Sequence, residues 1–197
     1  MAVKQFGSEI LTSGDVNTYL ANSGLVSVLP TTVTNGTLSN GTVTFSGVSS
    51  LTMNGVFTSA YTNYVIVARL YTTASDCFYQ NTSGSTPAAT AYNYSVMQAY
   101  PGVGVSISKT TNTSQFVFTS NSGGAFYGLV TADIFSPVPS EPTGLQMSHT
   151  RQDGSYANPA SYIFSGNHQT AGSYDGFKLN VASGTMTGKI WVYGRRD

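Results

Sequence analysis

From Val16 to Ala68 the chain carries no charged side chain, and this stretch restricts the possible folds more than any other feature. Over the whole chain only 8% of residues are charged, against about a quarter in an ordinary soluble domain. Hydroxyl-bearing, β-branched and aromatic side chains take their place, and these suit strands that are half buried. The composition therefore predicts an all-β protein rather than amphipathic helices.

Length and charge limit the classes of protein that are possible. The chain has 197 residues, and an all-β domain of about this size often forms one unit. Eight Lys and Arg balance eight Asp and Glu, and the cations are scattered apart from Arg195 and Arg196. Without a basic stripe to neutralise phosphates, we expect no nucleic-acid partner. A net charge near zero gives little repulsion between copies and favours a homo-oligomer.

Cys77 is the only cysteine, so no internal disulfide can form. We expect a small semi-buried side chain, because no pattern places a histidine beside it as a base. The first residues lack the apolar core of a signal peptide, and no apolar run reaches transmembrane length. We therefore expect a protein that is made in a cytoplasm, is not exported by a conventional signal, and does not insert into a membrane.

One helix signal lies near the N-terminus. Thr12 precedes Asp15 by three residues, similar to the spacing of a capping box, and apolar residues then recur at helical spacing on one face. A helix of about ten residues is too short to be stable alone, so this face must dock on something. We interpret residues 1–24 as an anchor segment, either a short helix or extended. Its candidate docking residues are Phe6, Ile10, Leu11, Val16, Tyr19 and Leu20.

Beyond residue 24 the sequence alternates between strand and turn patterns. Residues 42–45 and 51–53 alternate with period two, whereas 63–71 is a more continuous apolar run that suits a central strand covered on both faces. Asn-Gly dipeptides, the strongest short hairpin signal, begin at positions 35, 40 and 54. We expect further strands at 92–100, 104–108, 115–118, 125–135, 145–152, 161–169, 177–181 and 189–193. Turns are expected at 81–87, 110–114, 120–124 and 137–144.

This alternation predicts an antiparallel β-sandwich of jelly-roll type over residues 25–197, because about ten short strands follow one another with regular turns. No repeat of solenoid or propeller period is visible. No linker is long enough to divide the domain.

The sequence contains none of the usual catalytic or cofactor motifs: no nucleophile elbow, phosphate-binding loop, metal-spaced His or Cys pair, or calcium loop. Two of Asp133, Asp153 and Asp175 could converge as the carboxylate pair of a glycosidase, but Asp-Gly at 153 and 175 is an ordinary turn dipeptide. For His149 a packed strand residue is favoured over a pH switch or ligand contact. We therefore predict no enzyme, with no catalytic residue, cofactor or metal.

Thirteen tyrosines and one tryptophan are the remaining candidates for function. These side chains offer a large contact area and a polar tip, so they are enriched at recognition surfaces and can stack on sugar rings. Core and cross-strand roles are commoner in a sandwich of this kind. The candidate surface-recognition residues are Phe78, Tyr79, Tyr92, Tyr94 and Tyr100.

Three segments resemble a known family. They are FGSEILTSGDVNTYL (residues 6–20), FTSAYTNYVIV (57–67), and YDGFKL followed by SGTMTGKIWVYGR (174–179 and 183–195). In this order they resemble tail-associated virion proteins of tailed bacteriophages, in which such an opening precedes a variable β domain. Residues 72–144 show no such match.

The resemblance implies a virion structural protein of the minor-tail, tail-fibre or receptor-binding type, usually a homotrimer. Its N-terminal segment would bind other virion proteins, and its β domain would adhere to the host surface, with a cell-surface glycan as a candidate partner. Two alternatives stay open. One is a capsid decoration or head-fibre protein, and the other is a carbohydrate-binding or depolymerase-like module on the same fold.

Overall fold

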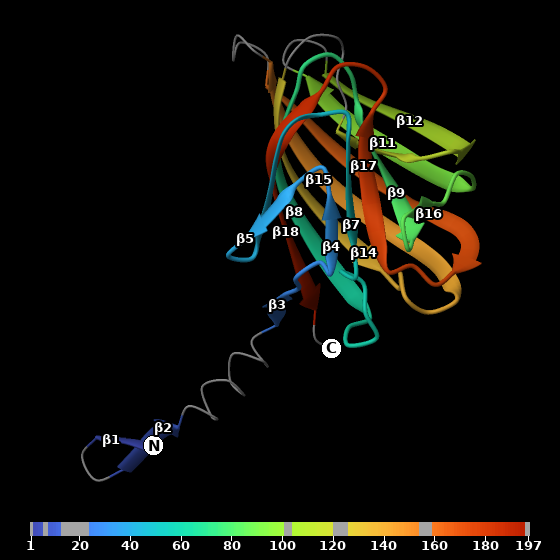
Figure 1. Cartoon of the computed structure of the whole chain (residues 1–197). Coiled ribbons are helices and arrows are strands. Elements are labelled where there is room, and N and C mark those ends of the chain that lie inside the picture. Colours follow the sequence, from blue (N-terminus) through green and yellow to red (C-terminus); the bar gives the residue numbers. More distant parts are fainter. Residues whose placement is uncertain are drawn as a thin grey trace.

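The structure, a computed structural model, describes residues 2–5, 8–12, 24–100, 104–119, 126–153 and 159–195. Every regular element in these residues is a strand. Strands β1 (Ala2–Gln5) and β2 (Ser8–Thr12) pair only with each other as an antiparallel hairpin, which stands apart from the other strands in Figure 1. The helix predicted after Thr12 falls on residues 13–23, outside the described residues.

All other strands belong to two antiparallel sheets (Figure 1). The smaller sheet has the order β10-β9-β17-β7-β4, with β13 also paired to β9. Its strands are β4 (Thr32–Thr34), β7 (Ser50–Asn54), β9 (Cys77–Ser83), β10 (Thr86–Pro87), β13 (Phe116–Thr119) and β17 (Gly176–Val181).

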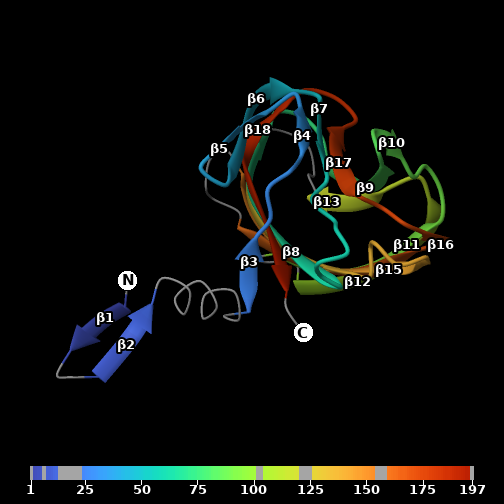
Figure 2. The same ribbon diagram turned by 60° about the horizontal axis from the view of Figure 1, so that its bottom comes forward.

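The larger sheet has the order β12-β11-β16-β15-β14-β8-β18-β6-β5, with β3 also paired to β18. Its strands are β3 (Leu25–Ser27), β5 (Thr37–Ser39), β6 (Thr42–Val48), β8 (Asn63–Thr72), β11 (Tyr92–Tyr100), β12 (Gly104–Thr113), β14 (Phe126–Phe135), β15 (Glu141–Asp153), β16 (Ala160–Gly172) and β18 (Met186–Arg195). Figure 2 shows the two sheets facing each other, with β8 and β18 on one side and β9 and β17 on the other. The predicted antiparallel β-sandwich is confirmed, and the jelly-roll order stays a prediction.

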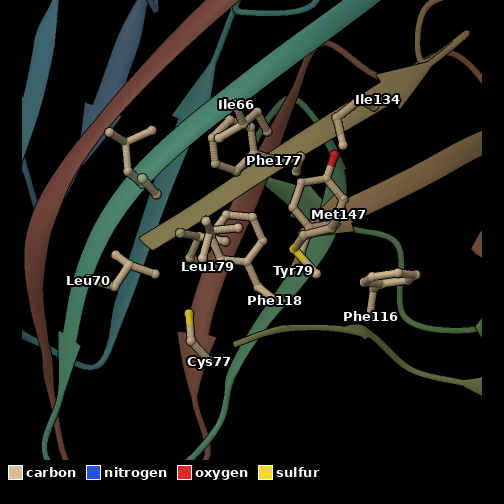
Figure 3. Packing of buried hydrophobic residues seen from close by; sticks show 14 of the residues in the cluster. Ile66, Leu70, Cys77, Tyr79, Phe116, Phe118, Ile134, Met147, Phe177 and Leu179 are labelled. Atoms are coloured by element: carbon tan, nitrogen blue, oxygen red, sulfur yellow. The ribbon is translucent and has the colours of Figure 1, made fainter. Parts of the chain in front are cut away.

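The core lies between the sheets and follows the two-residue period of the strands. In β14 every second residue from Phe126 to Ile134 is buried, and the residues between them face outward. Ile66, Leu70, Ile134 and Met147 of the larger sheet face a group of side chains from the smaller sheet (Figure 3). That group is Cys77, Tyr79, Phe116, Phe118, Phe177 and Leu179.

Candidate functional site

Two of the five predicted surface-recognition residues are core residues. Tyr79 and Tyr92 are fully buried, so the prediction that they lie on the surface is wrong. The Tyr79 hydroxyl donates a hydrogen bond to Oδ1 of Asn81 (2.7 Å), and the Asn81 backbone N–H donates to the Tyr92 hydroxyl (2.7 Å). Burial raises the pKa of both tyrosines. Their polar tips are used inside the sandwich, which is why large hydroxyl-bearing rings are tolerated there.

Of the other three predicted recognition residues, the structure describes the side chains of two. Phe78 and Tyr94 are half-buried and pack against the core cluster. The ring of Tyr94 lies 5.0 Å from that of Phe116, centroid to centroid. Tyr100 is the last residue of β11. Phe78 and Tyr94 therefore serve mainly the packing of the two sheets, and the recognition role of Tyr100 stays a prediction.

The predicted anchor residues are only partly described. Ile10 and Leu11 lie on β2, within the N-terminal hairpin. Phe6, Val16, Tyr19 and Leu20 lie outside the described residues. The anchoring role of this segment stays a prediction.

An open groove of about 330 Å³ lies on the outer face of the larger sheet, away from the core. It runs across the neighbouring strands β6, β18, β8 and β14. Its outward-pointing side chains come from residues that face each other in register, so the sheet itself fixes their positions. We call this groove the outer groove. The residues whose outward side chains line it are Thr44, Arg69, Tyr71, Tyr127, Thr187 and Lys189.

Arg69 and Lys189 are the charged residues of the outer groove. They occupy directly opposite positions on β8 and β18, and both side chains are exposed. Neither forms an ion pair within the described ranges, where Arg195 and Asp133 form the salt bridge. Among the residues that the structure describes, none that lines the groove is acidic. Two like charges that face each other across a strand pair are unfavourable, and an anion between them would relieve this repulsion.

Tyr71 and Tyr127 form the aromatic wall of the same groove. They are opposite each other on β8 and β14, with ring centroids 4.8 Å apart and an interplanar angle of 40°. Tyr127 is 39% exposed. An aromatic pair held on rigid strands offers a flat apolar surface at little entropic cost.

Gly188 sets the spacing of the strands beneath the groove. A Cβ at this position would overlap the backbone carbonyl oxygen of Arg69 and lie 3.0 Å from the ring of Phe45. Only glycine therefore allows β18 to approach β8 and β6 this closely.

A second exposed feature of the same face is an apolar stripe at the end of the sheet. Ile107 on the edge strand β12 pairs with Met97 on β11, which pairs with Ile163 on β16. Ile107 is 76% exposed, Val105 beside it 66%, and the other two over 40%. We call Met97, Val105, Ile107 and Ile163 the edge stripe. Contiguous exposed apolar side chains on an edge strand are typical of a surface that associates with another protein.

His149 belongs to a buried cluster on the inner face of the larger sheet. Its ring stacks on Tyr162 at 5.2 Å and lies 5.9 Å from Phe126, and neither ring nitrogen has a hydrogen-bond partner in the described structure. Burial, with a smaller effect of the nearby Arg151 cation, lowers the pKa of His149 to about 3. The expected packed strand histidine is confirmed, and its ring is neutral at physiological pH.

Of the remaining candidates, Cys77, Asp133 and Asp175 have structural contacts. Cys77 is fully buried, which raises the pKa of its thiol. Oδ1 of Asp133 accepts a hydrogen bond from Arg195 at 2.7 Å, and Oδ1 of Asp175 accepts one from the Gly84 N–H at 2.9 Å. Asp153 ends β15.

No group of three or more His, Cys, Asp or Glu side chains within the described ranges is arranged to hold a metal ion. The part of the chain that the structure describes has no helix with the length and hydropathy needed to cross a bilayer.

Comparisons with protein-family models, with curated proteins and with solved structures give no match. The outer groove was not predicted from the sequence. One available signal was Arg69, the charge that ends the uncharged stretch and interrupts an otherwise apolar strand. The pairing partner Lys189 lies 120 positions further along the chain, and only the register of β8 and β18 brings the two together.

Proposed function

We propose that this chain is a structural protein of a tailed-bacteriophage virion, and that its β-sandwich adheres to the host surface without catalysing a reaction. The virion assignment is supported by the three sequence segments that resemble tail-associated proteins. Adhesion is supported above all by the outer groove, in which cations, aromatic rings and hydroxyls share one open face.

The groove suits adhesion because the sheet holds its side chains in place. Tyr71, Tyr127, Arg69 and Lys189 project from β8, β14 and β18, strands in the middle of the larger sheet. Binding groups on paired strands are better positioned than groups on loops, so little conformational entropy is lost when a ligand is bound. An open groove also admits a long surface polymer that extends past it at both ends.

A homo-oligomer, a trimer by the family resemblance, is part of the proposal. The edge stripe supports it, because no strand among the described residues pairs with the outer edge of β12 and its apolar side chains are exposed. A second copy of the chain would cover both. The outer groove lies across β6, β18, β8 and β14, at a distance of several strands from β12. Association through the stripe therefore leaves the groove free.

Immunogold labelling of particles tests the virion assignment. An antibody against the full chain is applied to intact particles purified from a lysate of cells that produce the protein. Label at the tail tip is the expected result. Label on the head would favour capsid decoration over adhesion at the tail. Particles without label would overturn the virion assignment.

A further inference from the structure

We infer that the outer groove binds an acidic saccharide, with the anionic group between Arg69 and Lys189 and the sugar ring on Tyr71 and Tyr127. This inference rests on the proposed adhesive function and names the ligand class of the same site. The anionic group of the ligand is inferred from the two cations, and its sugar ring from the two tyrosines.

The charge requirement comes from the opposed cations. Arg69 and Lys189 face each other across β8 and β18, have no ion pair in the described part of the chain, and share the groove with no acidic side chain. The carboxylate of Asp133 lies on the same face, but it is engaged by Arg195 at 2.7 Å. The groove is therefore a local excess of positive charge on a chain whose net charge is zero. A carboxylate, sulfate or phosphate group accepts hydrogen bonds from both cations.

The ring requirement comes from the aromatic pair. Tyr71 on β8 is paired with Tyr127 on β14, and Arg69 is paired with Leu129. The two pairs are two residues apart along the strands, so they are neighbours on the same face of the sheet. Since residues two apart on a strand are separated by about 7 Å, one side of the groove is cationic and the next is aromatic. This offset fits a sugar ring with an anionic substituent, because the C–H face of the ring packs on tyrosine while the substituent reaches the cations.

Hydroxyl groups complete the site. Thr44 faces Lys189 on β6, and Thr187 faces Tyr71 on β18, so both flank the cationic and aromatic groups. Oγ1 of Thr44 donates a hydrogen bond to the Thr37 carbonyl oxygen (3.4 Å), so it can still accept one from a sugar hydroxyl. Oγ1 of Thr187 accepts a hydrogen bond from the Gly47 N–H (3.0 Å), so it can still donate one. The groove volume of about 330 Å³ lies at the lower end of the range of small-ligand sites, which suits one or two sugar units of a longer polymer.

The same features disfavour a nucleic acid as the ligand. Two cations neutralise at most two phosphates. Arg195, the other cation on the described part of β18, is paired with Asp133, so no stripe of free cations continues along this strand. A free inorganic anion would leave the aromatic pair without a role.

Titration calorimetry on the full chain tests the inference. The ligands are three acidic trisaccharides (containing galacturonate, glucuronate or sialic acid), a neutral galactose trisaccharide, and inorganic phosphate. At least one acidic trisaccharide should bind about tenfold more tightly than the neutral one and than phosphate, and the affinity should fall as salt is added. Arg69→Gln, Lys189→Gln and Tyr127→Ala should each weaken binding about tenfold, in line with the loss of one charged or stacking contact.

Two matched variants control for general effects of charge and ring removal. Lys109→Gln removes a cation at the β12 end of the same sheet, and Tyr193→Ala removes an outward tyrosine from β18. Neither residue lines the groove, so both variants should bind as the unchanged protein does. Circular dichroism confirms that each variant is folded before its affinity is interpreted.

Other outcomes overturn the inference. If none of the acidic trisaccharides binds, or if the neutral one binds equally well, the acidic-saccharide assignment is wrong. Phosphate binding as tight as that of the trisaccharides would reduce the site to a simple anion site. Binding of fluorescently labelled protein to whole bacteria distinguishes failure of the acidic-saccharide inference from failure of the proposed adhesive function. Cell binding that survives Arg69→Gln refutes the inference and keeps adhesion, whereas absence of cell binding by the unchanged protein refutes adhesion.

Discussion

Replacing the buried histidine of β15 should remove a defined part of the acid sensitivity of the fold. His149 lies between Phe126 and Tyr162 with no hydrogen-bond partner in the described structure for either ring nitrogen. Burial lowers its pKa from an ordinary 6.5 to about 3. The unfolded chain therefore binds a proton on this ring below pH 6.5, and the folded chain does so only near pH 3.

The sign and size of the effect follow from this difference. Because the unfolded state binds more protons, the stability due to His149 is complete above pH 6.5 and is lost as the pH falls towards 3. Between pH 7.5 and pH 5 the folded ring stays neutral while the unfolded ring becomes protonated. Linkage then gives a loss of about 2 kcal/mol in the free energy of unfolding. This is a large fraction of the stability of a typical domain, about 5–15 kcal/mol.

Urea unfolding at pH 7.5 and pH 5, followed by the fluorescence of Trp191, measures this loss. The quantity compared is the drop in unfolding free energy between the two pH values. His149→Leu removes the titrating ring from an apolar site, so the drop should shrink by about 2 kcal/mol relative to the unchanged protein. His149→Phe provides a second variant if the leucine packs poorly.

His168→Gln is the matched control, because it removes the other histidine and leaves His149 in place. The part of the acid sensitivity that is due to His149 should persist in this variant. An unchanged drop in His149→Leu and His149→Phe would refute the reasoning, since it would mean that this ring binds protons equally well in the folded and unfolded states.

Three further results are expected. Gly188→Ala should lower the free energy of unfolding by about 2 kcal/mol or more in urea titrations, since a Cβ would overlap the Arg69 carbonyl, and a loss below about 0.5 kcal/mol would contradict this strand spacing. Ile107→Lys should lower the mass measured by light scattering to the 20.7 kDa of one chain, whereas an unchanged oligomer would exclude the edge stripe as its interface. Deletion of residues 1–24 should leave a folded oligomeric β domain that no longer enters particles, and an unfolded product would assign this segment to the core.

The sequence predicted the fold class because strand patterns depend on local chemistry. The predicted run 63–71 is β8 (Asn63–Thr72), and the predicted hairpin at Asn40 joins β5 and β6. There the backbone adopts φ values of 48° at Asn40 and 76° at Gly41, as a two-residue hairpin turn requires.

The same signal was misleading at the other two Asn-Gly dipeptides. Asn35-Gly36 joins β4 of the smaller sheet to β5 of the larger one. Asn54 is the last residue of β7 in the smaller sheet, and the next strand after Gly55 is β8 of the larger sheet. Asn and Gly supply backbone conformations that a sharp turn needs. Whether the chain returns to the same sheet depends on packing between the sheets, which no dipeptide encodes.

The turn predicted at 81–87 was wrong at its start, because Asn81 and Thr82 are fully buried within β9. Their polarity suggested a loop, but Asn81 accepts a hydrogen bond from Tyr79 and Thr82 donates one to Asn54. A buried polar residue is stable only with such partners, and these partners come from tertiary structure. The same limit applies to the outer groove, whose residues are adjacent only through strand register.

Hydroxyl-radical footprinting tests most directly whether the protein adheres through the outer face of its larger sheet. The full chain is oxidised alone and after binding to an envelope preparation from the host bacterium, and protected side chains are identified by mass spectrometry. Protection of Tyr71, Tyr127 and the neighbouring Leu129 is the predicted result, with Tyr193 unchanged. Protection confined to the smaller sheet, or an unchanged oxidation pattern for envelope-bound protein, would contradict the proposed binding surface.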